Sequence, residues 1–239
     1  MELSGYQIIE PMGRDEHSES YLAKRLDTGM RVVIKCWCKE SIECSDPDAT
    51  IRSFLREGEY ASQISHPNIA NICAVGETDD LIYCVTDYVC GDSLESRAGD
   101  LCLLDKIYVV KQLAGALDYL ADKGIIIQSV SPSTILLTTD QSRPCLTRVW
   151  EYQNAFATAN EQEEREDLYL HRYLSPEQIA NETVDIRSSL YNLGMVFYYL
   201  LAGSSKSIAL AKVIGENKNS AESRVQLSSK LALFQEVVD

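Results

Sequence analysis

The residues best able to do chemistry by type alone are eight cysteines and three histidines. Thiolates bind metals or act as nucleophiles only beside suitable neighbours. The sequence has no Cys-x-x-Cys pair and no histidine at zinc-ligand spacing from the cysteines, which stand at positions 36, 38, 44, 73, 84, 90, 102 and 145. This usage favours a reduced, cytoplasmic protein without a zinc site, and a disulfide-bonded form is the open alternative. His171 is interpreted as structural.

Charged side chains are the second source of chemistry. The chain carries 22 Lys and Arg against 36 Asp and Glu, a net charge of −14. A general nucleic-acid binder needs clustered basic residues, so this class is excluded. The acidic stretch 161–167 predicts a solvated loop, with docking of a basic partner or repulsion at a cleft as the alternative. No stretch reaches the roughly 18 apolar residues of a membrane span, and the N-terminus lacks a signal-peptide pattern.

Hydrophobic periodicity separates a β-rich first part from a helical second part. Apolar and β-branched runs predict strands over 6–12, 20–24, 31–37, 69–75 and 81–89. A helix is expected from Ile51, stopped by the His-Pro-Asn sequence at 66–68. Two longer helices are predicted over the ranges 105–123 and 186–202, each followed by glycine. Between them we expect segment 125–127 to pair as a strand with segment 135–137.

Six short stretches follow one another in a family-specific order: Val-Val-Ile-Lys at 32–35, Phe-Leu-Arg-Glu at 54–57, His-Pro-Asn-Ile at 66–69, Thr-Asp-Tyr-Val at 86–89, Tyr-Leu-Ser-Pro-Glu-Gln at 173–178 and Ser-Ser-Leu-Tyr-Asn-Leu-Gly at 188–194. Together they resemble the eukaryotic-like (Hanks-type) serine/threonine protein kinase domain in its bacterial form. The resemblance implies an α+β, two-lobed fold with a small antiparallel β-sheet lobe, one main helix, a larger α-helical lobe and a shortened C-terminal part. We expect one domain over 1–239, with lobes 1–89 and 100–239 joined by a hinge at 90–99.

The resemblance places half of a vestigial nucleotide cleft in the first lobe. Lys35 stands where the family's strand lysine holds the α and β phosphates, and Glu57 stands where the helix glutamate pairs with that lysine. Thr86 occupies the gatekeeper position. The Asp87 carbonyl and the Val89 amide are expected to face the edge of adenine.

The same alignment shows where the nucleotide site is degraded. Among the phosphate-loop glycines only Gly13 survives, and Asp15 adds bulk and negative charge beside a triphosphate. Ser20 replaces the valine above the base, and Val33 replaces the alanine below it. We therefore expect either no cofactor or weak, metal-independent binding of ATP.

The catalytic loop has lost every charged or metal-binding member. The family sequence His-Arg-Asp-x-Lys-x-x-Asn aligns with 127–134, where Ile127 and Gln128 replace the first two residues. Ser129 stands at the proton acceptor, Ser131 at the phosphate-binding lysine and Thr134 at the magnesium-binding asparagine. Loss of general-base help alone costs about 10² to 10⁴ in rate. The resemblance therefore implies that no catalytic residue remains.

Three further positions bear on the site. The metal-binding Asp-Phe-Gly triplet aligns either with 148–150 or with 151–153; the second frame is favoured and leaves Glu151 as a weak candidate for magnesium. Ser189 replaces the aspartate that anchors the catalytic loop, so the loop is expected to lose its anchor. Glu177 is expected to lack its late arginine partner, because the sequence stops at Asp239, as a shortened domain or a fragment.

These losses lead to the hypothesis of a pseudokinase, that is, a chain that is not an enzyme. It is expected to act in signalling as a scaffold or regulator that binds another protein, such as a kinase or a signalling or secretion component. One alternative is a nucleotide-binding enzyme with altered or very weak transferase activity, using Lys35, Glu57 and Glu151. Another is a structural or sensory module of a larger membrane-associated protein.

Overall fold

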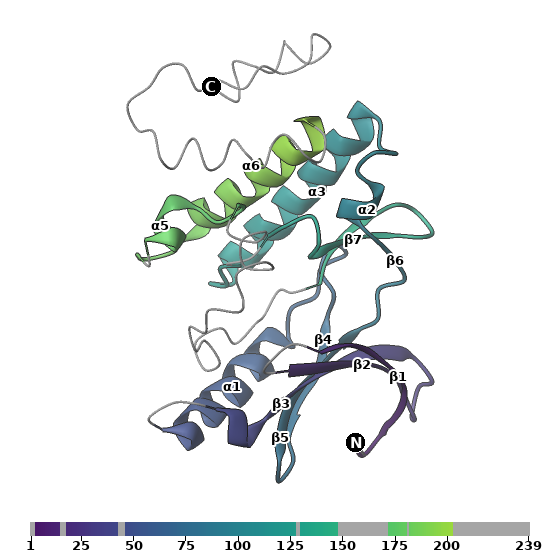
Figure 1. The fold of residues 1–239 in the computed structure, drawn as a ribbon, viewed down its shortest axis with the longest axis vertical. Helices are drawn as coiled ribbons and strands as arrows, with labels where there is room; N and C mark the ends of the chain where they lie inside the picture. Colours follow the sequence, from purple (N-terminus) through teal and green to yellow (C-terminus); the bar gives the residue numbers. More distant parts are fainter. Residues whose placement is uncertain are drawn as a thin grey trace. The chain divides into compact units, whose positions relative to one another are not determined.

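A computed structural model describes residues 3–14, 18–42, 46–127, 130–147, 172–180 and 182–202. Within these ranges the chain forms two compact units, the first ending at Cys90 and the second beginning at Gly91 (Figure 1). Each unit is considered by itself. Four predicted site residues lie outside the described ranges, namely Asp15, Gln128, Ser129 and Glu151, as do the acidic stretch, His171 and both frames of the metal-binding triplet.

The first unit is built on an antiparallel five-stranded sheet in the order β1-β2-β3-β5-β4. Burial alternates along most of β3, as expected for a strand whose successive side chains point to opposite faces of a sheet. A short 3-10 turn, η1 (Lys39–Ser41), follows β3. The strands are β1 (Tyr6–Arg14), β2 (Ser18–Arg25), β3 (Arg31–Cys38), β4 (Ile72–Glu77) and β5 (Leu81–Asp87).

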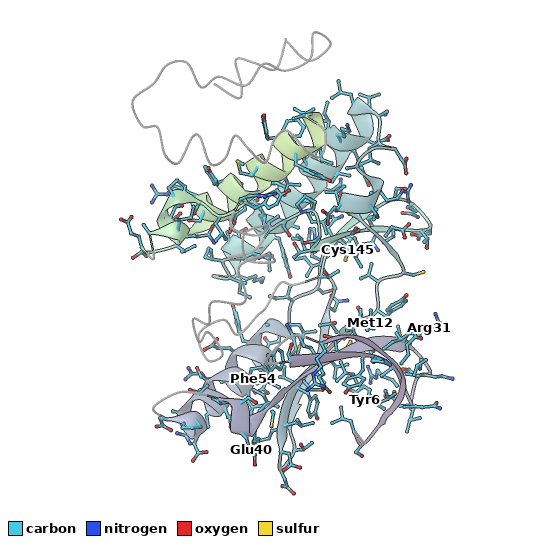
Figure 2. The ribbon with its side chains drawn as sticks, in the orientation of Figure 1. Tyr6, Met12, Arg31, Glu40, Phe54 and Cys145 are labelled. Atoms are coloured by element: carbon cyan, nitrogen blue, oxygen red, sulfur yellow. The ribbon has the colours of Figure 1, made fainter. Side chains whose placement is uncertain are left out.

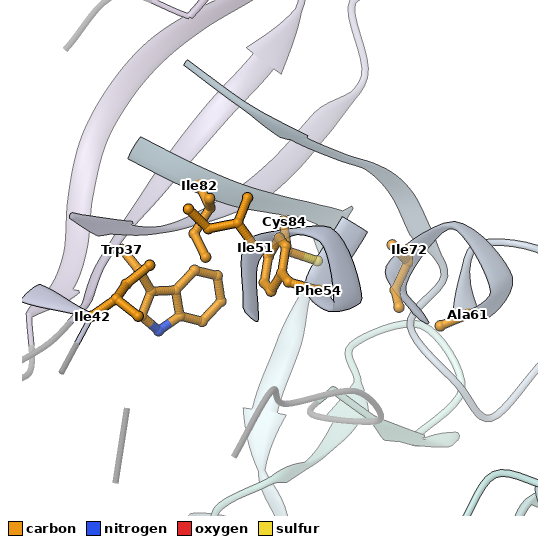
Figure 3. Packing of buried hydrophobic residues seen from close by; sticks show 8 residues of the cluster. All are labelled: Trp37, Ile42, Ile51, Phe54, Ala61, Ile72, Ile82 and Cys84. Carbon is orange, nitrogen blue, oxygen red and sulfur yellow. The ribbon is translucent and has the colours of Figure 1, made fainter. Parts of the chain in front are cut away.

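Helix α1 (Pro47–Ala61) covers one face of this sheet (Figure 1). Asp46 caps its N-terminus by accepting a hydrogen bond from the Ala49 amide at 2.9 Å, and Pro47 occupies the first turn, where no amide donor is required. Its inward face packs on β3, β4 and β5, and Phe54 meets Trp37 edge to face at 5.5 Å between ring centroids (Figure 3). The buried cluster consists of Trp37, Ile42, Ile51, Phe54, Ala61, Ile72, Ile82 and Cys84.

A second apolar cluster covers the opposite face of the sheet. Its fully buried members are Leu3, Ala23, Val32, Ile34, Cys36 and Val85, with Tyr6 and Cys73 packed against them. Figure 2 labels one residue from each layer, Phe54 on α1 and Tyr6 on β1. The sheet is therefore packed on both faces: β3, β4 and β5 contribute side chains to both clusters, whereas β1 and β2 contribute to the second cluster.

The second unit combines two long helices with a three-stranded sheet. Helices α3 (Leu103–Asp122) and α6 (Ile186–Ala202) pack against each other, and α3 ends before Gly124, whose φ of 70° suits glycine. Strand β7 (Ile135–Thr138) lies between β6 (Gly91–Ser93) and β8 (Pro144–Leu146). The short helices are α2 (Leu94–Arg97) and α5 (Pro176–Ile179).

The predicted pairing of segment 125–127 with segment 135–137 is wrong. Strand β7 pairs with β6 and β8 instead, and residues 125–127 form no strand. Gly91 permits this arrangement, because a side chain there would collide with the Leu137 backbone. Both long helices and all five strands of the first sheet are found where the sequence predicts them, within a few residues at their ends.

Candidate functional site

Strand register gathers the predicted nucleotide-contacting residues of the first unit. Gly13 pairs with Ser20, Ser20 with Lys35, and Val33 with Thr86. Residues paired across antiparallel strands project from the same face, and residues two apart along a strand do so as well. Ser20, Val33, Lys35 and Thr86 therefore share the face on which α1 packs. Strand pairing thus brings residues far apart in the sequence onto one face of the sheet.

Lys35 and Glu57 do not form the predicted ion pair. The Glu57 carboxylate is exposed and accepts a hydrogen bond from Ser53 Oγ at 2.7 Å, and within the described part of the chain no ion pair joins it to Lys35. The Lys35 ammonium lies over the Trp37 ring, 5.3 Å from the centroid. The reason is the orientation of α1, which buries Phe54 and Gly58 and turns Glu57 toward solvent.

Asp87, the last residue of β5, is the residue whose carbonyl is expected to face adenine, and its side chain is hydrogen-bonded to the segment that leads into β4. Asn71 Nδ2 donates to one carboxylate oxygen at 2.8 Å, and the Cys73 thiol donates to the other at 3.1 Å. Burial and the bond to Asp87 raise the pKa of the Cys73 thiol to about 12. Sequence analysis missed Asn71 and Cys73, although their spacing of two residues at the start of a strand is a weak signal of a shared face.

The described part of the catalytic loop is held together by hydroxyl groups. Thr134 Oγ1 accepts from the Ser131 amide and donates to the Ser131 carbonyl, both at 3.0 Å. Ser131 Oγ lies 2.9 Å from Ser133 Oγ. The Thr134 carbonyl in turn accepts from the amide and the hydroxyl of Thr147, at 3.2 and 3.0 Å. Neutral hydroxyls thus form a closed turn where the family has charged side chains.

Ser189 overturns the expectation that this loop has lost its anchor. Its Oγ donates to the Ile127 carbonyl at 2.7 Å, and both residues are buried, with Ser189 0% exposed. A hydroxyl can replace a carboxylate here because the partner is a carbonyl oxygen, which needs only a donor. The backbone at the start of the loop is therefore fixed to α6.

The resemblance to kinases implies magnesium, and Thr134, which stands at the position of the magnesium-binding asparagine, does not fit that role in the described turn. Thr134 is 2% exposed, and its hydroxyl both donates and accepts within its own turn. Magnesium prefers carboxylate, carbonyl and water oxygens in an open octahedral arrangement. Across the described ranges, no three His, Cys, Asp or Glu residues gather as a metal site. The remaining candidate ligand, Glu151, lies outside those ranges.

Glu177 has a local partner in place of the arginine it was expected to lack. The Ser188 hydroxyl donates a hydrogen bond to its carboxylate, which lowers the pKa of Glu177 below its ordinary value. Ser188 lies at the start of α6 and is fully buried. The short helix α5 is therefore joined to α6 by a bond whose acceptor strength depends on ionisation of Glu177.

Comparison with known proteins identifies the family. A family model described as the protein kinase domain matches residues 6–232. The chain belongs to the protein kinase domain family. The serine/threonine-protein kinase PrkC of Bacillus subtilis is 28% identical over 221 residues, which cover 88% of this chain and 33% of that protein. The probable kinase PknB of Bifidobacterium longum is 30% identical over 214 residues, covering 83% of this chain and 30% of that protein.

A solved structure supports the same fold for this kinase-family chain. The crystal structure of the Mycobacterium tuberculosis PknI kinase domain superposes with a TM-score of 0.70 at 23% identity, covering 100% of this chain and 87% of that chain. The likeness shows the α+β protein kinase fold. The chain spans about a third of the length of the curated relatives named above.

Family membership corrects the prediction that the chain is not an enzyme. The relatives that align with most of this kinase domain are named serine/threonine-protein kinases. The prediction followed from replaced residues in the catalytic loop, and it treated their loss as loss of all chemistry.

The described residues also bear on the predictions about membrane spans and cysteine pairing. No helix in the described ranges is long and apolar enough to cross a membrane, and none of the seven cysteines there is in a disulfide.

Proposed function

We propose that this kinase domain binds ATP weakly and without a divalent metal, transfers phosphate slowly, and acts in cytoplasmic signalling chiefly by binding another protein. The observation that carries the proposal is the contrast between two places in the chain. Lys35 is kept on one face with Ser20, Val33 and Thr86, whereas the Thr134 hydroxyl already donates and accepts hydrogen bonds within its own turn.

The retained cation favours phosphate binding over loss of all nucleotide contact. An ammonium group attracts a polyphosphate from any direction, because it acts as a point charge with three donors. Ser20 and Thr86 add hydroxyls on the same face, and Val33 adds apolar surface. Without a metal to neutralise charge, transfer of the terminal phosphoryl group is expected to be slow.

The test is nucleotide-induced stabilisation of the purified chain, measured with ATP plus magnesium and with ATP plus a chelator. ATP at ten times its dissociation constant stabilises by about 1.4 kcal/mol, or about 3–6 °C in melting temperature for a chain of this size. The shift should be equal with and without magnesium, absent in Lys35→Ala, and kept in Lys24→Ala, an exposed cation on β2. A shift that requires magnesium, or no shift with millimolar ATP, contradicts the proposal.

Turnover and signalling need separate measurements. Incorporation of label from γ-labelled ATP into the chain or a generic substrate should be slow and should vanish in Lys35→Ala; complete absence of incorporation in the wild type contradicts slow transfer. In the native host lacking this gene, Lys35→Ala should still restore signalling if protein binding carries the role. Failure to restore it would assign the role to turnover instead.

A further inference from the structure

Asp87, at the end of β5, makes three hydrogen bonds to the segment that leads into β4. Its carboxylate accepts from Asn71 Nδ2 at 2.8 Å and from Cys73 Sγ at 3.1 Å, and its amide donates to the Asn71 carbonyl at 2.9 Å. Hydrogen bonds to an ionised acceptor are roughly twice as strong as neutral ones. Both carboxylate oxygens and the amide are thus committed to the segment that leads into β4.

Strand alternation brings Asn71 and Cys73 to the side of the sheet on which Asp87 lies. Residues two apart along a strand project from the same face, and Ile72 between them packs in the α1 cluster while Cys73 lies against the opposite cluster. Ile72 pairs with Thr86 and Ala74 pairs with Val85, so a bulge begins after Ile72, and both Cys73 and Ala74 lie against that opposite cluster. The Cys73 thiol therefore reaches the Asp87 carboxylate on the neighbouring strand.

The next residue, Tyr88, is restrained from the other side. The Tyr88 amide donates to the carbonyl of Arg31, the residue that begins β3 and is labelled in Figure 2, at 3.4 Å. The chain leaving β5 is thus held to the neighbouring β4 segment at Asp87 and to β3 at Tyr88. These restraints flank the Asp87 carbonyl and directly precede the Val89 amide, the two backbone groups expected to face the edge of the base.

A fixed carbonyl and amide discriminate between purines. Adenine presents an amino donor beside a ring-nitrogen acceptor, whereas guanine presents a carbonyl acceptor beside an N–H donor. A rigid carbonyl and amide therefore match adenine and leave guanine with opposed dipoles. A backbone free to rotate its peptide groups loses this preference, because it can present either pattern at small cost.

We propose that Asn71 and Cys73 are positioning residues that hold Asp87 and thereby set the preference of this domain for adenine over guanine nucleotides. They act through the backbone of residues 87–89 and contact no nucleotide themselves. This inference rests on the proposed binding of ATP. It assigns a role to two residues that lie outside the family motifs recognised in the sequence.

The experiment compares ATP and GTP dissociation constants in matched variants. Asn71→Ala and Cys73→Ala should each weaken ATP binding about tenfold, equivalent to about 1.4 kcal/mol, while GTP binding changes little, so that the ATP-to-GTP preference collapses. Cys73→Ser should retain the preference, because a hydroxyl still donates to Asp87. Cys36→Ala removes another buried thiol beside the same apolar cluster and should leave the preference unchanged.

The outcomes separate this inference from the proposal on which it rests. If wild-type binding of ATP is lost in Lys35→Ala but the ATP-to-GTP ratio is unchanged in both Asn71→Ala and Cys73→Ala, the positioning role is overturned and ATP binding stands. If the wild type binds no ATP, both are overturned. If Cys36→Ala changes the ratio as much as Cys73→Ala does, general loosening of the cluster explains the effect and the specific role of Asp87 is refuted.

Discussion

Replacing Ser189 with alanine tests whether the hydroxyl anchor organises the catalytic loop. The substitution removes the donor that lies 2.7 Å from the Ile127 carbonyl, in a place where Ser189 is 0% exposed and Ile127 is 3% exposed. Water cannot readily replace the donor at such a site, and a buried acceptor left without a partner costs about 1–3 kcal/mol. We expect Ser189→Ala to lower the free energy of unfolding by about 2 kcal/mol, which corresponds to about 4–8 °C in melting temperature for a chain of this size.

Urea-induced unfolding followed by far-UV circular dichroism measures this difference. The matched control is Ser53→Ala, which removes a hydrogen bond of the same length from an exposed helix surface. The control should change stability by less than about 0.5 kcal/mol, as most substitutions at exposed sites do. Equal effects of the two substitutions, or a change below about 0.5 kcal/mol for Ser189→Ala, would refute the idea that Ser189 anchors the loop.

Three further substitutions probe the fold. Phe54→Ala empties the centre of the α1 cluster and should cost about 3–5 kcal/mol in urea unfolding; a loss below about 1 kcal/mol would contradict that packing. Glu177 has a lowered pKa because Ser188 donates to its ionised form. The contribution of this bond to stability is therefore present above the ordinary pKa of 4.5 and is lost as pH falls through the lowered pKa. The melting temperature of Glu177→Gln should accordingly fall less on acidification than that of the wild type. Gly91→Ala would drive a methyl group into the Leu137 backbone and should cost about 1–3 kcal/mol, whereas wild-type melting would show that β6 lies elsewhere.

Much of the fold was predictable because its signals are local. The apolar positions of α1 and the alternation in β3 each depend on residues within a few positions of one another. The end of α1 was predicted less well, because the helix ends at Ala61, before the His-Pro-Asn sequence at 66–68 that was expected to stop it. The sequence predicted less well which side chains of the two long helices are buried. By periodicity alone, Ile107 belongs to the apolar stripe of α3 and Leu190 to that of α6, yet both are exposed, while Val109 is buried. A helix periodicity constrains the width of the apolar face, but the neighbouring helix decides its centre.

The residues of the candidate site also differ in how clearly the sequence marks them. Short motifs mark Lys35, Val33 and Thr86, and strand register places them on one face. Asn71 and Cys73 carry no motif, and their contacts with Asp87 arise only when the β4 segment pairs with β5.

By itself, the sequence determined the five strands of the first sheet, the two long helices, the kinase resemblance and the replacement of charged residues in the catalytic loop by uncharged, largely hydroxyl-bearing ones. The tertiary structure decided what those hydroxyls do. Ser189 and Ile127 are 62 positions apart, and Glu177 and Ser188 meet only because α5 docks at the start of α6. A hydrogen bond requires two atoms within about 3 Å. Residue type determines which atoms can donate, but the path of the whole backbone determines which carbonyl or carboxylate lies within reach.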